Sequence, residues 1–424
     1  MSRWLSAALL LTLLAQLSLA SMPGAATKVE LTHLMYEYHG VKWHDYLQFM
    51  AKRFEDATGM SIEVVISTGG IDGFRTKLLS MVAGGVAPDT ADANPELGAP
   101  LIVHGMFEDL RPYVQRDRFP LDHIPPVAVQ GVTTPSGQLW GIPVSVFPVV
   151  TFFNADLFAQ HGLQNPRELG EQWTWETLLS SAKRLSRDTD GDGVPESYGT
   201  TRISYRWEMQ VHQAGGQLYD RVVYPTRSQF NSPEVLRAVE FIRRLYADNL
   251  ATNHSSFRVS MGNTGFDVVD GPGSIGPSFQ NLSFAWDIAR QPKGPASRSA
   301  RVNPDGFQIV SHSKNKAAAW QWIRFLTGDA DNQMELARIT GRLPSLKEAM
   351  IRYPRAGGIE LPDNWQAMIE TAFDPAGYAA YVVPNATAID RVVNPIMSQI
   401  WAGSMAPATG LQQIHDLLPA LLEQ

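Results

Sequence analysis

The chain contains no cysteine among its 424 residues. This absence excludes disulfide bonds, thiolate metal ligands and a thiol nucleophile, and it excludes the acylated cysteine by which many exported bacterial proteins are tethered. Basic side chains are in the minority, with 35 Lys and Arg against 42 Asp and Glu. This acidic balance argues against nucleic acid or anionic lipid as a partner.

The sequence motifs of several enzyme classes are missing as well. There is no H-E-x-x-H, no P-loop and no Gly-x-Ser-x-Gly elbow. Residues 271–276 match the G-x-G-x-x-G spacing, but Pro277 follows at once and no helix is predicted there, which disfavours a dinucleotide site. No catalytic residue and no cofactor are therefore predicted. A secreted carbohydrate-active hydrolase with paired carboxylates stays open as the alternative, because such pairs are assembled in space.

The chain has one long apolar run, at its start. Arg3 supplies a positive charge, residues 7–15 are almost all Leu and Ala, and small residues follow up to residue 26. This pattern is typical of a secretory signal peptide, and the run is too short to cross a bilayer comfortably. We expect residues 1–26 to be a cleaved signal peptide and, without a lipobox cysteine, a freely diffusing periplasmic protein.

Strands and helices are predicted to alternate in the next part of the chain. Strand patterns at 29–35 and 61–66 alternate with helical patterns at 43–54 and 74–83. Such an order implies right-handed crossovers and a parallel sheet with helices on both faces. Ligands of these sheets bind outside the carboxyl ends of the strands. About 400 residues also exceed what one hydrophobic core supports, so we expect two lobes.

Short sequence blocks along the chain carry a resemblance to a known family. They occur in one order at residues 54–59, 77–89, 141–143, 153–158, 173–178, 214–216, 271–272, 313–320, 325–328 and 341–344. No single block is specific, but the ordered set resembles the extracellular solute-binding proteins of ABC sugar importers, of the maltose-binding and glycerol-3-phosphate-binding kind. The similarity covers nearly the whole chain after residue 26.

This resemblance implies the type II periplasmic-binding-protein fold: two α/β lobes, each a sheet flanked by helices, joined by hinge strands around a ligand cleft. The first lobe would comprise 27–142 and 305–345, and the second 143–304 and 346–424. The resemblance also implies a monomer without catalytic activity. It would capture a sugar, polyol or sugar-phosphate-like solute and deliver it to an ABC transporter membrane permease.

Sugar recognition needs flat apolar faces for C–H groups and directional polar groups for hydroxyls. We therefore expect the ligand to contact loops at the strand ends of the first lobe, aromatic and glycine positions of the second, and an arginine near the cleft. These residues are Tyr36, Glu37, Tyr38, His39, Gly69, Gly70, Asp92, Asn94, Phe147, Trp207, Gly271, Gly273, Ser274 and Arg342. For the loop residues ordinary turn and capping roles fit equally well, and for Trp207 so does a half-buried core position.

One position departs from the family pattern. Relatives often carry a Trp directly after the Gly-Pro pair at 271–272, where it stacks on the sugar, but this chain has Gly273. Either another aromatic residue stacks on the solute, or the solute is not a plain sugar ring. A phosphodiester or polyol headgroup therefore stays open.

An acidic segment resembles the first half of a calcium loop. Asp188, Asp190 and Asp192 alternate with turn residues, and Glu196 stands at the ninth position. The twelfth position is Gly199 and not the bidentate Glu that completes such loops. A solvated turn is favoured, and a structural calcium ion is the alternative.

Overall fold

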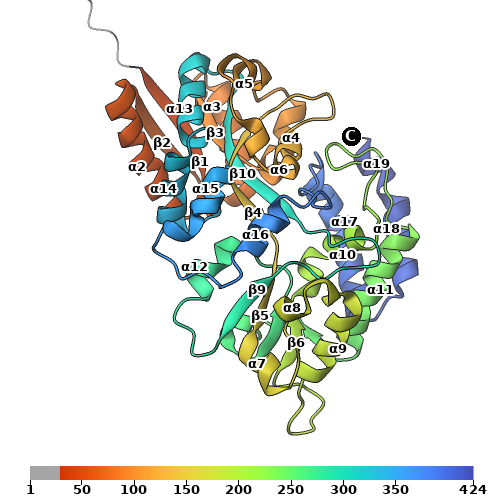
Figure 1. The fold of residues 1–424 in the computed structure, drawn as a ribbon. Helices are drawn as coiled ribbons and strands as arrows, with labels where there is room; N and C mark the ends of the chain where they lie inside the picture. Colours follow the sequence, from red (N-terminus) through yellow and green to blue (C-terminus); the bar gives the residue numbers. More distant parts are fainter. Residues whose placement is uncertain (1–28, 424) are drawn as a thin grey trace, which may run out of the picture.

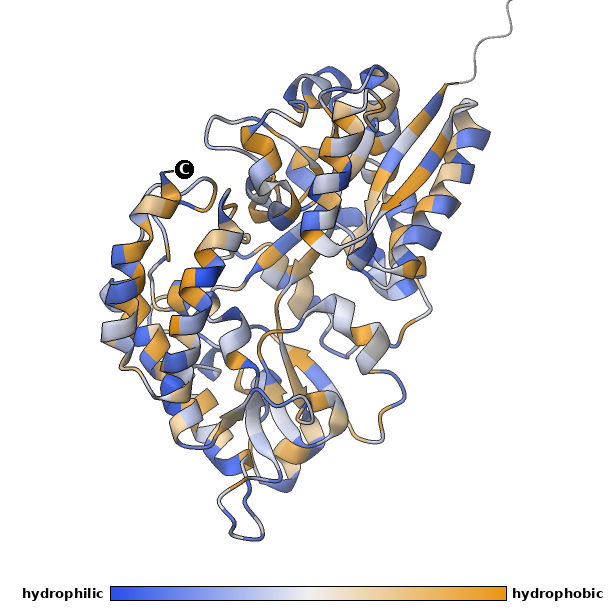
Figure 2. Ribbon diagram, turned by 180° about the vertical axis from the view of Figure 1, so that it is seen from behind, coloured by the Kyte–Doolittle hydropathy of each residue, from blue (hydrophilic) through white to orange (hydrophobic). Residues whose placement is uncertain are grey.

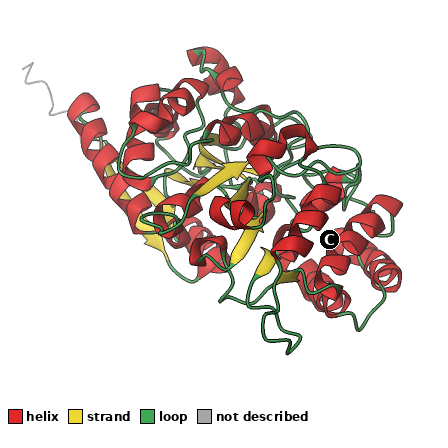
Figure 3. Cartoon of the chain, turned by 60° about the horizontal axis from the view of Figure 1, so that its bottom comes forward, coloured by secondary structure: helices red, strands yellow, loops and turns green. Residues whose placement is uncertain are grey.

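The computed structural model describes residues 29–423, so the predicted signal peptide lies outside the described residues. The fold contains two separate five-stranded sheets, and helices pack around each of them (Figure 1, Figure 3). Within the described range, no helix combines the length and hydropathy that a membrane span requires. The surface helices carry both hydrophilic and hydrophobic residues, as helices with one packed face do (Figure 2).

The first sheet has the strand order β2-β1-β3-β10-β4. Strand β1 pairs in parallel with β2 and β3, whereas β10 runs antiparallel to both β3 and β4. The parallel pairing predicted for the first strands is thus present. The bounds of these strands are Glu30–Tyr36 (β1), Ser61–Ser67 (β2), Thr90–Ala93 (β3), Ile142–Pro148 (β4) and Val302–Ile309 (β10).

The second sheet has the strand order β7-β6-β8-β5-β9. Strands β6, β7 and β8 are parallel, and β5 runs antiparallel to its neighbours β8 and β9. The bounds are Thr151–Asn154 (β5), Tyr198–Thr201 (β6), Ala251–Thr252 (β7), Thr264–Asp267 (β8) and Trp286–Ala289 (β9).

Apolar residues at helical spacing attach the helices to the sheets. In α2 a stripe that begins at Trp43 and ends at Phe54 is buried, and the helix stops at Gly59, whose φ of 77° suits glycine. Helix α9 starts at a Thr174 capping box, and α11 starts after Ser232, whose hydroxyl accepts a hydrogen bond from the amide of Val235.

The helices divide into two groups. Those near the first sheet are α2 Val41–Thr58, α3 Gly70–Ala83, α4 Pro95–Val103, α5 Arg111–Asp117, α6 Pro126–Gly131, α13 Lys316–Thr327, α14 Ala330–Thr340, α15 Lys347–Arg352 and α16 Gln366–Ala372. Those near the second sheet are α7 Ala155–Gln160, α8 Pro166–Leu169, α9 Trp175–Leu185, α10 Glu208–Gln213, α11 Pro233–Ala247, α12 Ile275–Ser278, α17 Ala386–Ala402, α18 Pro407–Leu417 and α19 Pro419–Leu422. Short 3-10 turns are η1 Glu37–His39, η2 Leu121–His123, η3 Gly170–Gln172, η4 Ile203–Arg206, η5 Val259–Met261, η6 Pro272–Ser274 and η7 Tyr353–Arg355.

The chain crosses between the sheets where β4 leads into β5 and where β9 leads into β10 (Figure 1). The boundaries predicted at 142/143 and 304/305 fall inside β4 and β10, which both belong to the first sheet. Helices α15 and α16 pack on α14 and β4, so they too lie with the first sheet, although the predicted boundary at 345/346 places them in the second lobe. Buried Ala349 and Met368 are the apolar contacts that hold them there.

Candidate functional site

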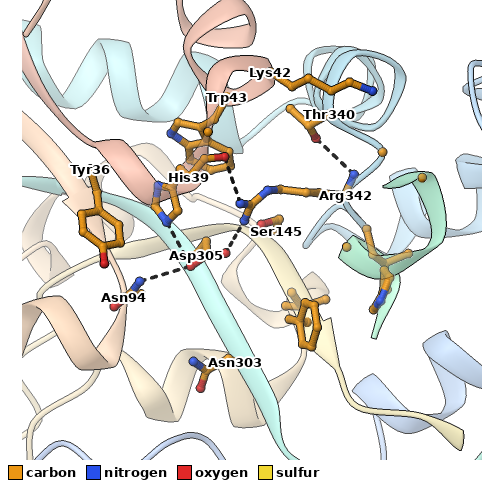
Figure 4. A pocket seen from close by; sticks show the side chains of 18 of the residues that line it. Tyr36, His39, Lys42, Trp43, Asn94, Ser145, Asn303, Asp305, Thr340 and Arg342 are labelled. Atoms are coloured by element: carbon orange, nitrogen blue, oxygen red, sulfur yellow. Dashed lines mark hydrogen bonds and ion pairs between the residues drawn. The ribbon is translucent and has the colours of Figure 1, made fainter. Parts of the chain in front are cut away.

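A cavity of about 810 Å³ lies between the two sheets, within the range typical of small-molecule sites. Its walls come from the ends of β1 and β4, from β10, and from η4, η6 and the turn after α14. Figure 4 shows polar side chains of the first-sheet side facing into it. Six of the sequence-predicted residues line the cavity: Tyr36, His39, Asn94, Phe147, Gly273 and Arg342.

Asp92 is the buried centre that organises one wall. One carboxylate oxygen accepts hydrogen bonds from the amide of Tyr36 and from Nδ1 of His39, both at 2.8 Å. The other oxygen lies 3.1 Å from Nε2 of His33 and accepts from Trp43 Nε1 at 3.2 Å. Asp92 has no exposed surface. It therefore holds the η1 turn in place and does not line the cavity.

His39 lies between two carboxylates. Its Nδ1 is hydrogen-bonded to Asp92, and its Nε2 is 3.5 Å from a carboxylate oxygen of Asp305. Burial by itself would lower the pKa of His39, but the charges of Asp92 and Asp305 outweigh it and raise the pKa to about 9. His39 is therefore protonated at neutral pH, and it holds the pKa of both carboxyl groups below their usual range although burial opposes this.

Asp305 contacts three side chains of this wall, those of His39, Asn94 and Arg342 (Figure 4). Arg342 Nη1 forms an ion pair with it, and Asn94 Nδ2 donates to it at 3.4 Å while Asn94 Oδ1 caps α4. The Arg342 guanidinium carbon also lies 4.8 Å from the centre of the Trp43 ring. Arg342 is thus fixed on two sides, by charge and by stacking.

The opposite wall is aromatic and basic. The guanidinium carbon of Arg206 lies 5.3 Å from the ring centre of Phe147 and 5.5 Å from that of Tyr205. Phe147 packs against Gly271 and Gly273, where an added Cβ would lie 2.7 and 3.2 Å from its ring atoms. The small residue at 273 therefore makes room for the Phe147 ring.

Arg301 connects the two halves of the site. It precedes β10 in a crossing segment, pairs with Glu96 of α4, and lies 3.6 Å from a carboxylate oxygen of Glu208 in α10. Glu96 is next to the first sheet and Glu208 next to the second, so one guanidinium bridges both.

The other predicted residues lie outside this cavity. Glu37 accepts a hydrogen bond of 2.6 Å from the amide of Gly70, and Gly69 and Gly70 start α3 with positive φ. Tyr38 is 73% exposed on the surface. Gly271 is buried behind Phe147, and Ser274 ends the η6 turn. Ligand contact stays a prediction for all of these residues.

Trp207 also lies outside the cavity. Its ring packs against Phe230 and Trp401, with ring centres 5.9 and 6.2 Å apart. This environment matches the half-buried core position considered from the sequence.

Several cavity residues were not predicted from the sequence. Three of them follow a strand pattern: Arg301, Asn303 and Asp305 alternate with buried Val302 and Pro304. Alternate residues of a strand share a face, so this pattern was the available signal. The remaining unpredicted residues of the wall are Gly40, Val41, Lys42, Trp43, Glu96, Ser145, Val146, Tyr205, Arg206, Pro272, Gly276, Thr340, Gly341 and Leu343.

The acidic segment after α9 brings together part of the predicted calcium set. One carboxylate oxygen from each of Asp188, Asp190 and Glu196 lies within 4.8 Å of the others, and all three residues are exposed. Asp192 does not belong to this group; it accepts a hydrogen bond from the amide of Val194. Oxygens of the group also accept backbone hydrogen bonds within the turn, so a calcium ion stays a prediction.

Comparisons with known proteins agree with this architecture. The family model described as bacterial extracellular solute-binding protein matches residues 41–333. No curated protein sequence matches the chain.

Solved structures match over almost the full length. An ABC substrate-binding protein from Listeria monocytogenes in complex with cycloalternan is 23% identical with a TM-score of 0.76, covering 93% of this chain and 99% of its own. The cyclic α-maltosyl-1,6-maltose binding protein from Arthrobacter globiformis is 18% identical (TM-score 0.75, coverage 93% and 99%). UgpB from Mycobacterium tuberculosis in complex with glycerophosphocholine is 15% identical (TM-score 0.73, coverage 94% and 99%). The two-lobed α/β fold expected from the sequence is thereby confirmed.

Proposed function

Because the chain belongs to the bacterial extracellular solute-binding proteins, we propose that it is the substrate-binding component of an ABC transporter that imports a sugar or sugar-like solute. The observation that carries the proposal is a cavity whose walls come from both sheets. A solute held there contacts both lobes at once, so it favours the closed arrangement over the open one.

The chemistry of the walls suits a polyhydroxylated solute. Tyr36 and Phe147 offer aromatic surface for C–H groups, while Ser145, Asn303 and Asp305 offer donors and acceptors for hydroxyls. The Oδ1 atom of Asn303 accepts a hydrogen bond from the amide of Ala380 at 3.0 Å, which orients its amide group. Such fixed polar groups favour a ligand with matching hydroxyls.

The carboxylates of the cavity are poorly suited to hydrolysis. Asp305 is paired with Arg342 and His39, and Glu96 is paired with Arg301. Burial disfavours the ionised form of Asp305, but the charges of His39 and Arg342 outweigh burial, so the pKa of Asp305 is lowered. The general acid of a glycosidase needs the opposite, a raised pKa. The family consists of binding proteins, so we favour capture and release of an unaltered solute over the hydrolase alternative.

We propose that the protein captures its solute outside the cytoplasm. The apolar start of the sequence has the pattern of a signal peptide, and cysteine is absent. We infer a monomer that diffuses in the periplasm and docks, when closed, on a membrane permease.

Thermal shift and calorimetry test the proposal. We expect at least one member of a panel of sugars, oligosaccharides, polyols, sugar phosphates and glycerophosphodiesters to raise the melting temperature of the purified protein and to be recovered intact. Asn303→Ala should lower the affinity for that ligand about tenfold, because the ligand loses a hydrogen-bonding partner. The exposed substitution Glu240→Gln serves as the matched control. Turnover of the ligand by the protein alone would contradict the proposal.

A further inference from the structure

One cation of the cavity, Arg206, forms no ion pair with any residue of the described range 29–423. Among residues 29–423, no hydrogen bond or ion pair reaches the Arg206 guanidinium, and its Nε is buried without a partner. The other two cavity arginines differ: Arg342 pairs with Asp305, and Arg301 pairs with Glu96. Arg206 is therefore available for an acceptor that is not part of this structure.

The surroundings of Arg206 make an unpaired state costly. Burial disfavours its charged form and the nearby charge of Arg301 adds to this; the carboxylate of Glu208 opposes both effects only in part, so the pKa of Arg206 is lowered. A guanidinium nevertheless stays protonated in proteins. A partly buried guanidinium that lacks a hydrogen-bond acceptor has lost part of its hydration, so an incoming anion would be bound favourably.

Two aromatic rings hold the guanidinium in position. The ring centres of Phe147 and Tyr205 lie 5.3 and 5.5 Å from its central carbon. Cation–π contacts of this kind supply no hydrogen-bond acceptor, so N–H groups of the guanidinium remain for a planar or tetrahedral oxyanion. The group is thus oriented before the ligand arrives.

The charge of the cavity is opposite to that of the chain. The whole sequence has a formal net charge of −7. Yet the acidic side chains of the cavity wall, Glu96 and Asp305, are already paired, while Arg206 and Lys42 form no ion pair with a described residue. The remaining field in the cavity is positive, which favours an anionic ligand over a neutral one.

From these observations we propose that the solute carries an oxyanion group, a phosphate ester or a carboxylate, which is bound by Arg206. The hydroxyl-bearing part of the solute would lie toward Asn303, Asp305 and Arg342. This proposal rests on the proposed function and narrows its ligand class to anionic sugar derivatives or polyol phosphates.

Matched ligand pairs test the oxyanion site by calorimetry. Each pair joins a neutral compound to an anionic derivative of it: glucose with glucose 6-phosphate, galactose with galacturonate, and glycerol with glycerol 3-phosphate. We expect the charged member of at least one pair to bind more than tenfold tighter. The phosphate and carboxylate arms then show which oxyanion is used.

Two variants separate a specific site from a general field. Arg206→Gln should remove the preference for the charged member and leave the affinity for the neutral member within about twofold. Lys42→Gln removes an exposed cation from the same cavity and should change the charged member's affinity less than about threefold. Because Arg206 makes no ion pair, we expect its variant to melt close to the wild type. Arg206→Met, which keeps the stem on Phe147, is the second variant if Arg206→Gln is unstable.

The outcomes are distinct. Equal affinity for both members of every pair that binds, or equal loss of both in Arg206→Gln, overturns the oxyanion site and leaves the proposed function intact. Binding of no compound in these pairs and none in the wider sugar panel overturns both. Competition by inorganic phosphate against the charged member, absent in Arg206→Gln, supports the site independently of the variant affinities.

Discussion

The Phe147 ring lies so close to Gly271 that a Cβ on this glycine would be 2.7 Å from ring atom Cε1 and 2.7 Å from the carbonyl oxygen of Pro148. A contact with backbone cannot be relieved by a rotamer change. At Gly273 the nearest atom is instead the ring edge of Phe147, at 3.2 Å. The two glycines therefore differ in what an added methyl group would do.

We expect Gly271→Ala to lower the free energy of unfolding by about 2 kcal/mol, because overpacking displaces both the ring and the backbone. Gly273→Ala should cost less than about 1 kcal/mol, because only the ring must shift. Urea unfolding of the two variants measures the difference. Equal stability of both variants would contradict this account of the Phe147 position.

The protonation of His39 predicts a pH dependence of stability. Its pKa in the folded protein is about 9, against an ordinary value of 6.5, because Asp92 and Asp305 outweigh the effect of burial. A raised folded pKa means that the stabilisation is complete below about pH 6.5 and is lost as the pH rises through 9.

We expect the free energy of unfolding to fall by up to about 3 kcal/mol between pH 6.5 and 9.5. In His39→Gln this dependence should be largely absent, while in His104→Gln, an exposed histidine, it should remain. Denaturant titrations at several pH values test this. A flat profile in the wild type would show that His39 is not protonated in the fold.

We expect substitution of Asp92 to lower the stability of the protein and not to act directly on ligand affinity. Its carboxylate accepts from the Tyr36 amide and from His39 and Trp43, and it has no exposed surface. Asp92→Asn leaves protonated His39 with an uncharged partner and replaces one of the two acceptor oxygens by an NH2 donor.

The expected cost of Asp92→Asn is about 3 kcal/mol, as for breaking a buried pair by changing one partner. Asp122→Asn, an exposed change of the same type, should stay within about 0.5 kcal/mol. Thermal and urea unfolding measure both. Unchanged stability with weakened ligand binding would instead make Asp92 a ligand contact.

Arg301 joins Glu96, next to the first sheet, to Glu208, next to the second, and we expect this bridge to restrain the two lobes from opening. Glu208→Gln removes one end of the bridge without touching either sheet. We expect the ligand-free protein to shift toward more open arrangements, seen as a larger radius of gyration in solution scattering, and ligand affinity to fall about threefold. Glu240→Gln should change neither quantity. An unchanged radius in Glu208→Gln would show that the bridge does not restrain the lobes.

Local sequence patterns predicted most elements of the first lobe. The strands expected at 29–35 and 61–66 are β1 and β2 within a residue, and the helix expected at 74–83 is α3, which starts earlier at Gly70. Periodicity succeeds here because each element buries one face, and a buried face imposes its spacing on the sequence.

The composition of the site could be predicted only in part, because its groups meet through tertiary structure. His39 and Asp305 are 266 positions apart in the sequence numbering and still share a contact of 3.5 Å. No local pattern indicates that β10 inserts beside β3, or that Asp92 turns inward while Asn94, two residues later, reaches the cavity. The alternating segment that ends at Asp305 carried a usable signal, but its meaning depends on which sheet the strand joins.

The crossing from β4 to β5 consists of Val149 and Val150, both without exposed surface. The amide of Val149 donates to the carbonyl of Arg301 in the second crossing segment, and that of Val150 donates to the carbonyl of Asp270. A joint so short and so firmly tied on each side leaves only a few backbone torsions free to turn. From this geometry we expect the two halves to move by rotation about the Val149–Val150 joint, so that the same two cavity walls face each other before and after the movement.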